Sequence, residues 1–477
     1  MIFKDTDFLF VIMLVNRVKE AKMKLDTPRL IIAGTGSGSG KTTVTAGILR
    51  CLIERGIKTA SFKCGPDYID PMFHSRITGR AGGTLDPFFC SGDTLKYLMT
   101  EESRGCDMAV AEGVMGYYDG IGFTSEASTY DVACATESPV LLVVGCRGMG
   151  ASAEAILKGF LEYTGEDSRI RGVIFNNISP RLAPTAVKKA EEMGVKVFGY
   201  LPSDRRFTLE SRHLGLVTAG EIKNFDEKIR LIAAEMEKTI DIDSIMRMAE
   251  QAGMLEFEAP ELLSEKPFAR GTKIAVSRDR AFNFIYRENI DMLERMGCRI
   301  VYFSPIDDEA LPDGIDGLIL SGGYPEIYAG SLSVNKSMRR SVKSAVESGL
   351  PTIAECGGFM YLHSILEGQD GARYPMAGII KGSCADSGSL GRFGYVTLKA
   401  EKNGLMCPEG SEMKAHEFHY WDSTSPGDDF DAVKPDGSRK WKCGFHTDTL
   451  YAGYPHFHFA SCPEACRRFV LKCMKKN

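Results

Sequence analysis

The residues around Cys356 have the pattern of a nucleophile placed at a sharp turn. In TIAECGGFMYL (Thr352 to Leu362), an apolar strand pattern is followed by the cysteine, two glycines and a helix pattern. Such a turn exposes the nucleophile, small neighbours permit strained backbone angles, and the helix start lowers the pKa of the thiol. We therefore expect the Cys356 thiolate to attack a carbonyl carbon, and the predicted substrate is the carboxamide of glutamine.

Two other stretches can complete a site for this chemistry. LSGGYPE (Leu320 to Glu326) offers backbone N–H groups to an oxyanion, and we expect these groups at Gly323 and, beside the nucleophile, at Gly357. YPHFHF near the C-terminus has His456 and His458 at alternate positions, so both imidazoles can lie on one face of a strand. We predict that His456 is the general base.

Simpler interpretations of these residues stay open. An isolated cysteine is usually a buried apolar residue, although Cys356 has its flanking glycines. The spacing HxHxxxCxxxC, from His456 to Cys466, could hold a metal ion, but it matches no common zinc pattern. HEFHY (His416 to Tyr420) is expected beside the same site, and core packing is an equal alternative for it.

A second set of residues has the pattern of a phosphate site. IIAGTGSGSGKTT (Ile31 to Thr43) is an apolar strand, a glycine-rich turn and the start of a helix. Backbone N–H groups of such a loop point at phosphates, its lysine reaches the β and γ oxygens, and its hydroxyl ligates Mg²⁺. A flexible glycine loop or a dinucleotide fold would not need the Gly-Lys-Thr-Thr run. The predicted ATP-binding residues are Gly38, Gly40, Lys41, Thr42 and Thr43.

Acidic residues follow the next strand patterns, at the edge where open α/β sheets place their ligands. Glu112 ends the apolar part of DMAVAEG, and Asp67 and Asp70 lie in FKCGPDYIDP. Because Mg²⁺ prefers oxygen ligands, we expect a carboxylate to hold the metal together with Thr42. Glu112 is the first candidate and Asp67 the second, against the alternative of solvated loop carboxylates.

The two sites fall in separate stretches of α/β pattern. From Arg29 onward, short Val- and Ile-rich runs alternate with amphipathic stretches, which predicts a parallel sheet with helices on both faces. The alternation stops near residue 246 and starts again at KIAVS (Lys273 to Ser277). We expect an N-terminal appendage (1–24), an ATP-binding domain (25–245), a linker (246–272) and a second α/β domain (273–477).

Composition restricts the class of protein. The chain has 477 residues, of which 44% are apolar and 25% charged, and this fits two globular domains. Its net charge of −5 provides no basic field, so no nucleic-acid partner is expected. Fourteen cysteines without a repeated short spacing indicate reduced thiols and a cytoplasmic location. No membrane partner is expected either, because the apolar run Phe8 to Val15 is shorter than the about 20 residues that span a bilayer.

Taken together, these motifs resemble those of the cobyrinate a,c-diamide synthases of cobalamin biosynthesis, with the hydrogenobyrinate and nickel-sirohydrochlorin enzymes as near relatives. The resemblance runs from Arg29 to the C-terminus and rests on GTGSGSGKTTVT, FKCGPDYIDP, EGVMGYYDG, RHLGLV, SGGYPE, AECGG, HEFHY and YPHFHF. It implies two doubly wound α/β domains. The first would be a P-loop NTPase domain similar to dethiobiotin synthetase, which also carries Gly-Thr where this chain has Gly34 and Thr35, and the second a class I glutamine amidotransferase domain.

The resemblance also implies an activity and further site residues. The activity is the amidation of the a and c acetate groups of a corrin macrocycle (cobyrinate) through an acyl phosphate, with ATP, Mg²⁺ and L-glutamine. Free ammonia would be protonated at neutral pH and lost to solvent, so we expect a sequestered route for it between the sites. A homodimer is compatible with the sequence. By motif, Asn176 would read the adenine, and Lys63, Tyr68, Arg212 and His213 would lie near the macrocycle carboxylates.

Departures from the family pattern mark what the sequence leaves open. Many glutaminases with a Cys-His-Glu triad have the sequence His-x-Glu, whereas His458 stands at the Glu position here. The group that orients His456 is therefore not identified. Ala415 and Trp421 flank HEFHY where family members often have Gly and Ser. No residue can be named that reads the macrocycle or its metal, so cobyrinate, hydrogenobyrinate and nickel-sirohydrochlorin all stay open.

Overall fold

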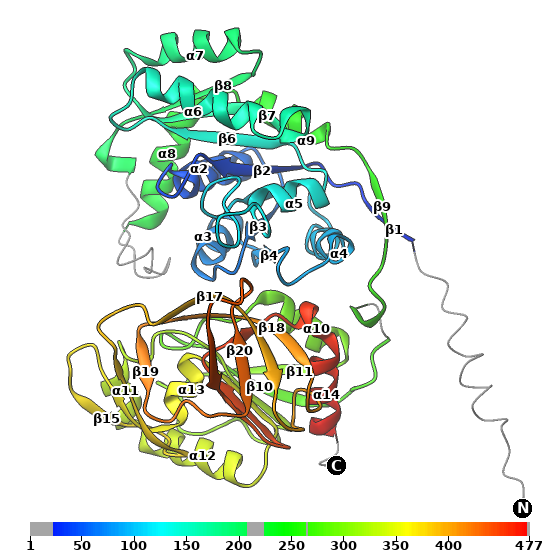
Figure 1. Ribbon diagram of the computed structural model, residues 1–477, viewed down its shortest axis with the longest axis vertical. Helices are drawn as coiled ribbons and strands as arrows, with labels where there is room; N and C mark the ends of the chain where they lie inside the picture. The colour runs from blue at the N-terminus through cyan, green and yellow to red at the C-terminus, as the bar shows by residue number, and fades with distance from the viewer. Residues whose placement is uncertain (1–21, 208–223, 264–265, 475–477) are drawn as a thin grey trace, which may run out of the picture.

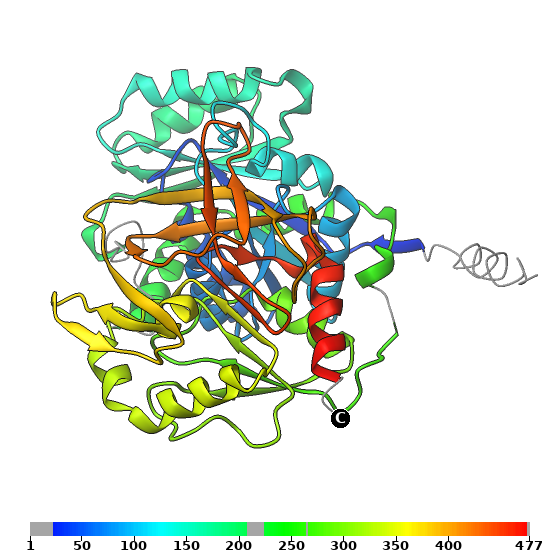
Figure 2. The ribbon, with the colours of Figure 1, turned by 60° about the horizontal axis from the view of Figure 1, so that its bottom comes forward.

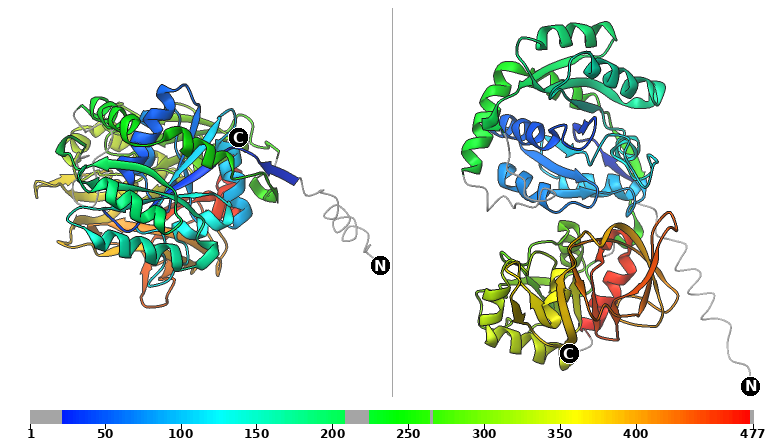
Figure 3. Two further views of the ribbon diagram at one scale, coloured as in Figure 1. Left: turned by 90° about the horizontal axis from the view of Figure 1, so that it is seen from above. Right: turned by 60° about the vertical axis from the view of Figure 1, so that its left-hand side comes forward.

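The computed structural model of the chain describes residues 22–207, 224–263 and 266–474, without the side chains of residues 166, 167 and 262. Two domains are stacked along the long axis of the molecule (Figure 1), and a view from the side shows the same two layers (Figure 3). Arg212, His213 and the apolar run at residues 8–15 lie outside the described residues. Within the described ranges, no helix is long and apolar enough to cross a membrane.

The first domain is built on a parallel sheet of seven strands, as the sequence predicts. All six residues of the strand that precedes the phosphate loop are buried, which is typical of a parallel sheet covered on both faces. In spatial order the strands are β4 (Gly83–Leu85), β3 (Thr59–Cys64), β5 (Met108–Glu112), β2 (Arg29–Gly34), β6 (Val140–Gly145), β7 (Ile170–Ile178) and β8 (Val197–Pro202).

Helices cover both faces of this sheet (Figure 1). Alternation along β2 divides its side chains between two cores, with Leu30 and Ile32 on one face and Ile31 and Ala33 on the other. The α-helices are α2 (Lys41–Glu54), α3 (Ile69–Thr78), α4 (Gly92–Glu102), α5 (Thr129–Ala135), α6 (Ala151–Glu162), α7 (Ala183–Glu192), α8 (Phe225–Thr239) and α9 (Ile242–Glu250), and the short 3₁₀ helices are η1 (Gly165–Ser168) and η2 (Arg205–Phe207).

The segment between the domains contains more regular structure than the sequence indicates. Helix α9 continues to Glu250 with Met248 and Ala249 buried, although the periodic pattern was expected to end near residue 246. Strand β9 (Leu255–Glu258) pairs antiparallel with β1 (Lys22–Leu25) on one side of the molecule (Figure 1), and η4 (Glu261–Leu263) follows. Two strands as short as these leave little periodicity in the sequence, so the sequence predicts a linker and an appendage for these residues.

The second domain has a central sheet of six strands, parallel except for its last strand. Figure 2 shows its C-terminal helix (red) along one side of the domain. In spatial order the strands are β11 (Arg299–Phe303), β10 (Lys273–Ser277), β12 (Gly317–Leu320), β13 (Thr352–Glu355), β23 (Leu450–Gly453) and β22 (Phe445–His446). The helices are α10 (Arg287–Arg295), α11 (Ala329–Val334), α12 (Lys336–Glu347), α13 (Gly357–Leu362), η5 (Phe459–Ser461) and α14 (Pro463–Met474).

The second domain contains two further sheets, which the sequence did not predict. Their strands come after α13 and before α14 along the chain. One contains β15 (Arg373–Pro375), β14 (His363–Glu367), β16 (Ile380–Asp386) and β19 (Trp421–Ser423). The other contains β21 (Lys440–Cys443), β20 (Phe430–Val433), β17 (Arg392–Ala400), β18 (Glu412–His419) and β24 (His456–Phe457). Strands β17 and β18 face the first domain (Figure 1), so the second sheet forms part of the surface between the domains.

Candidate active site

The phosphate loop joins β2 to α2, and its backbone requires glycine. Gly38 and Gly40 have positive φ angles of 77° and 92°, which side chains rarely adopt. A Cβ atom on Gly34 would lie 2.2 Å from Ser39 Oγ, whereas Gly36 has free space around it. Helix α2 has neither a side-chain cap nor an acidic residue in its first turn, so its first N–H groups can bind an anion.

Lys41 lies over this loop as the first residue of α2, and Thr42 and Thr43 follow it, both half-buried. The Lys41 ammonium donates to Gly36 O at 3.1 Å and to Met115 O. Burial, with the Lys63 ammonium nearby, lowers the pKa of Lys41 to about 8. Phosphate oxygens would be stronger acceptors than these two carbonyls, so the lysine is already placed to bind a triphosphate.

Glu112, at the end of β5, is completely buried and has three polar partners. Its carboxylate accepts from Thr42 Oγ1 at 2.7 Å and from Lys63 Nζ at 3.2 Å, and its second oxygen lies 2.8 Å from His74 Nε2. Burial alone would raise the pKa of Glu112, but Lys63, His74 and Thr42 hold it below its usual range. The structure thus brings the two predicted metal ligands, Thr42 and Glu112, together at the loop. His74, which is buried on α3 next to Phe73, was not among the predicted site residues.

Lys63 and the acidic pair of FKCGPDYIDP surround the same carboxylate. Lys63 Nζ lies 2.6 Å from Asp70 Oδ2 and donates to Gly113 O at 2.9 Å. Asp67 instead accepts from the backbone N–H of Ile69 at 2.7 Å, at the start of α3. Asp70 rather than Asp67 therefore shares Lys63 with Glu112. The contacts of Lys63 favour a role in holding the two carboxylates in place.

Asn176 contacts the phosphate loop from the end region of β7. Its Nδ2 atom donates to Ser39 O at 2.8 Å, and a Cβ atom on Gly40 would lie 1.8 Å from that nitrogen. The side chain is buried and supports the loop backbone. Its predicted contact with the adenine stays a prediction.

The backbone at Cys356 has the predicted strained turn between β13 and α13. Cys356 has φ 47° and ψ −101°, and its N–H donates to Gly453 O of the neighbouring strand at 2.8 Å. A positive φ at a residue other than glycine is costly and persists only where the surroundings enforce it. At Gly358 a Cβ atom would lie 2.1 Å from Leu320 O, so the second glycine after the cysteine is required for packing.

The expected lowering of the Cys356 pKa by the helix start is wrong for this structure. Burial raises the pKa of the Cys356 thiol, and the Glu326 carboxylate raises it further, whereas a backbone hydrogen bond from Gly357 lowers it less. Helix α13 has only six residues, so its N-terminal potential is small. The resting thiol is therefore protonated, and a base must remove its proton.

The other predicted residues of this site surround the same turn. A Cβ atom on Gly357 would lie only 3.0 Å from Gly323 N. The two predicted oxyanion segments are therefore in contact. On Gly322, a Cβ atom would lie 2.3 Å from His456 Cε1. Strand β24 places His456 opposite His416 of β18, which confirms that HEFHY lies beside the predicted base.

The two histidines of YPHFHF have different surroundings, although alternation would allow them to share a site. His456 Nδ1 lies 3.6 Å from Glu355 Oε2, whereas His458 Nε2 lies 3.7 Å from Glu288 Oε2 and its ring stacks on Phe89 of the first domain. Cys466, the last residue of the HxHxxxCxxxC spacing, packs in the core. Among the described residues, no group of three or more His, Cys, Asp or Glu side chains is placed to hold a metal ion.

Both halves of the chain match known domain families. Residues 30–217 match the CobQ/CobB/MinD/ParA nucleotide binding domain, and residues 273–463 match the CobB/CobQ-like glutamine amidotransferase domain. Proteins named cobyrinate a,c-diamide synthase from Caldanaerobacter subterraneus subsp. tengcongensis and Priestia megaterium are each 38% identical to the chain over 93% of its length, and the matches cover 98% and 97% of theirs. One from Thermoplasma acidophilum is 39% identical over 94% of this chain and 100% of its own.

The chain belongs to the cobyrinate a,c-diamide synthase family. This confirms the resemblance inferred from the motifs and the two predicted α/β domain types. A nucleotide-binding domain and a glutamine amidotransferase domain in one chain of this family make the protein a ligase that uses ATP and takes its amide nitrogen from glutamine.

In this member of the cobyrinate a,c-diamide synthase family, Tyr68 connects the two sites. Its ring centroid lies 5.2 Å from that of His456 and 4.6 Å from that of Tyr286, and it stacks on Phe284 at 5.2 Å. Asp70, two residues further on, holds Lys63 in the nucleotide site. One short segment of the first domain therefore contacts both the predicted glutaminase base and the predicted metal site.

Polar contacts hold the domains together around Tyr68. Tyr395 Oη donates to Asp86 Oδ2 at 2.9 Å, Lys414 Nζ donates to Phe88 O at 2.7 Å, and the Thr84 N–H donates to Glu288. Burial raises the pKa of Asp86 to about 7, and its hydrogen bond from Tyr395 offsets part of that effect. These contacts are hydrogen bonds between the two domains.

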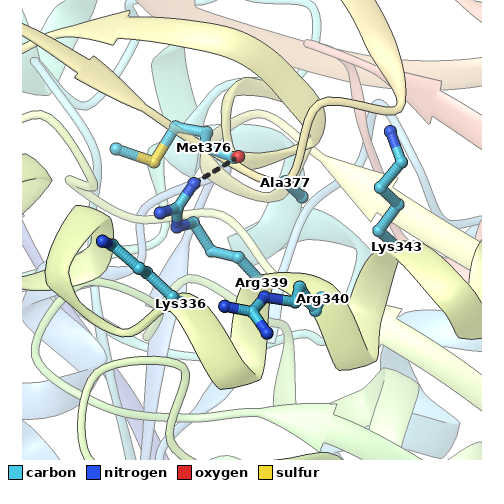
Figure 4. A pocket seen from close by; sticks show the side chains of 6 residues that line it. All are labelled: Lys336, Arg339, Arg340, Lys343, Met376 and Ala377. Carbon is cyan, nitrogen blue, oxygen red and sulfur yellow. Dashed lines mark hydrogen bonds between the residues drawn. The ribbon is translucent and has the colours of Figure 1, made fainter.

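A basic pocket lies apart from both sites, on α12 (Figure 4). Lys336, Arg339, Arg340 and Lys343 line it together with Met376 and Ala377, and its volume is about 150 Å³. Arg339 donates to Met376 O at 3.0 Å and Lys343 donates to Gly378 O at 2.6 Å. These two side chains attach the loop after β15 to the helix, which gives the pocket a structural explanation.

Proposed function

We propose that this protein forms amides at the a and c acetate carboxylates of cobyrinate, with ATP to activate each carboxylate and glutamine as the source of ammonia. The relatives named cobyrinate a,c-diamide synthase support the substrate, and amidation of hydrogenobyrinate or nickel-sirohydrochlorin is the alternative. The observation that carries the proposal is the ring contact between Tyr68 and His456, because it joins an ATP site and a glutaminase site through one segment. Separate enzymes would not need that contact.

The activation step corrects two weaknesses of a carboxylate, which is a poor electrophile with a poor leaving group. A substrate carboxylate oxygen attacks the γ-phosphorus of ATP, the bond to the β-phosphate oxygen breaks, and ADP leaves. Ammonia then attacks the acyl phosphate, and phosphate departs with the formation of the amide. Lys41 and the α2 N-terminus stabilise negative charge on the transferred group.

The ammonia arises at Cys356. His456 takes the thiol proton, the sulfur attacks the amide carbon of glutamine, and the N–H groups of Gly323 and Gly357 stabilise the oxyanion. His456 returns the proton to the leaving nitrogen, which releases ammonia and leaves a thioester. Water then hydrolyses the thioester to glutamate, and His456 again accepts a proton.

The remaining site residues are proposed for binding. Mg²⁺ suits the all-oxygen pair of Thr42 and Glu112, where it would offset phosphate charge. Asp67 is the second proposed metal ligand, and Asn176 is proposed for the adenine. Lys63, Tyr68, Arg212 and His213 are proposed near the macrocycle carboxylates. A cytoplasmic location and a homodimer are also part of the proposal.

A direct assay distinguishes the macrocycles. The purified protein is incubated with cobyrinate, hydrogenobyrinate or nickel-sirohydrochlorin, together with ATP, Mg²⁺ and glutamine, and the products are counted by mass spectrometry. We expect two successive amidations of cobyrinate. Each should change the mass by the amount that corresponds to the conversion of one carboxylate to a carboxamide. If hydrogenobyrinate or nickel-sirohydrochlorin is amidated faster than cobyrinate, that macrocycle is the substrate instead.

Tyr68→Ala is expected to open the ammonia route to solvent. Loss of the ring removes the contact with His456 and leaves a cavity between the sites, so ammonia escapes before it meets the acyl phosphate. We expect glutamate release to exceed amide formation in this variant, and the two to be equal in the native protein. Both products are measured in the same reaction.

Tyr68→Phe is the matched control, because it keeps the ring and its stacking partners. It should retain equal release of glutamate and formation of amide. Equal product formation by Tyr68→Ala would show that Tyr68 does not close the route.

A further inference from the structure

Glu355 is the residue directly before the nucleophile, and its carboxylate faces the predicted base. Glu355 Oε2 lies 3.6 Å from His456 Nδ1, and both side chains are almost completely buried. The other oxygen of Glu355 accepts from the backbone N–H of Phe457 at 3.1 Å. One carboxylate thus holds the backbone next to His456 and approaches the imidazole itself.

The usual position for such a carboxylate is filled by an imidazole in this chain. His458 stands two residues after His456, and burial lowers the pKa of His458 to about 3, so it is neutral. Neither of its ring nitrogens has a hydrogen-bond partner among the described residues, and its ring lies against Phe89 and Tyr286. His458 therefore contributes to the contact between the domains and cannot supply negative charge to His456.

Other titratable groups near His456 are neutral as well. Burial lowers the pKa of His416 to about 3 and that of His419 to about 4, while burial raises the pKa of Tyr68 well above its usual value. These groups come from β18 and from the loop before α3. Among the described residues, the carboxylate that makes an ion-pair contact with His456 is that of Glu355, on β13.

We propose that Glu355 is the positioning residue that orients His456 and stabilises its protonated form during glutamine hydrolysis. The proposal rests on the glutaminase function proposed above. When the 3.6 Å contact shortens on glutamine binding, Glu355 accepts the Nδ1–H of the imidazole, which leaves Nε2 free to take the thiol proton of Cys356 and to return it to the leaving ammonia. The protein thus keeps a Cys-His-Glu set of groups, with the carboxylate moved from the strand of the base to the strand of the nucleophile.

The fold explains how this exchange of position is possible. Glu355 is the last residue of β13, where it lies opposite Gly453 of β23, three residues before His456. The strained turn at Cys356 then directs the nucleophile away from the strand while Glu355 stays in it. In unliganded sites, catalytic hydrogen bonds are often long and shorten when substrate binds, which fits the present 3.6 Å.

Glu355→Gln separates a positioning role from a structural one. The amide oxygen of glutamine can still accept from the Phe457 N–H, so the backbone contact is retained while the negative charge is lost. We expect kcat for glutamine hydrolysis to fall by about 100-fold or more, with little change in KM for glutamine. A loss in kcat without a matching rise in KM would separate positioning of the base from a loss of glutamine binding.

Two further measurements keep the test decisive. Amidation with ammonium chloride should continue at the native rate in Glu355→Gln, which reports an intact fold and ATP site. Glu288→Gln is the matched control, because it removes the carboxylate beside His458 and should leave kcat for glutamine hydrolysis unchanged. A native kcat for glutamine hydrolysis in Glu355→Gln would overturn the proposal. Absence of glutamine hydrolysis by the native protein, with ATP and macrocycle present, would instead overturn the proposed function.

Discussion

Replacement of Cys356 by alanine is expected to abolish amidation with glutamine while amidation with ammonium salts continues. The variant lacks the sulfur that attacks the carboxamide, so the rate with glutamine should fall by on the order of 10³-fold or more. The ATP site lies in the other domain and keeps all its contacts, so free ammonia can still meet the acyl phosphate. The measurement is amide formation with saturating glutamine and, separately, with ammonium chloride at alkaline pH.

Cys298→Ala provides the matched control for this experiment. Cys298 is another buried cysteine of the second domain, and it packs in a different hydrophobic cluster from Cys356. Its replacement should leave both nitrogen sources active. A Cys356→Ala variant that amidates with neither source would contradict the division of labour between the domains. Full activity with glutamine would exclude Cys356 as the nucleophile.

The parts of the site that the sequence predicts are those where the backbone itself imposes residue type. Gly38 and Gly40 have positive φ angles, and Cys356 takes a strained turn that its glycine neighbours make possible, so these positions are visible as a pattern in one sequence. Alternating apolar strands and amphipathic helices likewise predict both parallel sheets, because strands such as β2, β3 and β12 are buried on both faces.

Side-chain partners that depend on packing between distant segments could not be predicted in the same way. His74 reaches Glu112 from α3, and Glu355 reaches His456 across two strands, although nothing in the local sequence of either pair marks the contact. The antiparallel sheets of the second domain are built from short strands with irregular alternation, so they gave no clear signal.

The pKa of Cys356 shows the same limit for electrostatics. A helix start after a cysteine predicts a lowered thiol pKa, but the sequence does not show how deeply the thiol is buried or that Glu326 lies near it. Burial dominates, so the pKa rises. Activation of the thiol must then come from His456, which increases the importance of the group that orients that base.

Lys41→Ala is expected to stop amidation with both nitrogen sources. The ammonium of Lys41 is buried at the phosphate loop, and removal of a preorganised charge at a transferring phosphoryl group typically costs about 10²–10³-fold in rate. Glutamine hydrolysis should persist, because the Lys41 ammonium donates to Gly36 and Met115 of the first domain and Cys356 keeps its surroundings. The measurements are ATP hydrolysis, amide formation with glutamine or ammonium, and glutamate release.

Lys58→Ala is the matched control, since Lys58 is an exposed lysine of the same domain, outside the phosphate loop. It should amidate normally. Comparison of Lys41→Ala with Cys356→Ala then assigns carboxylate activation to the first domain and ammonia release to the second. Ammonium should restore amidation only in Cys356→Ala, whose ATP site is intact. If Lys41→Ala amidates at the native rate with ammonium, the carboxylate is not activated at this loop. Activation must then occur at another site, or without an acyl phosphate.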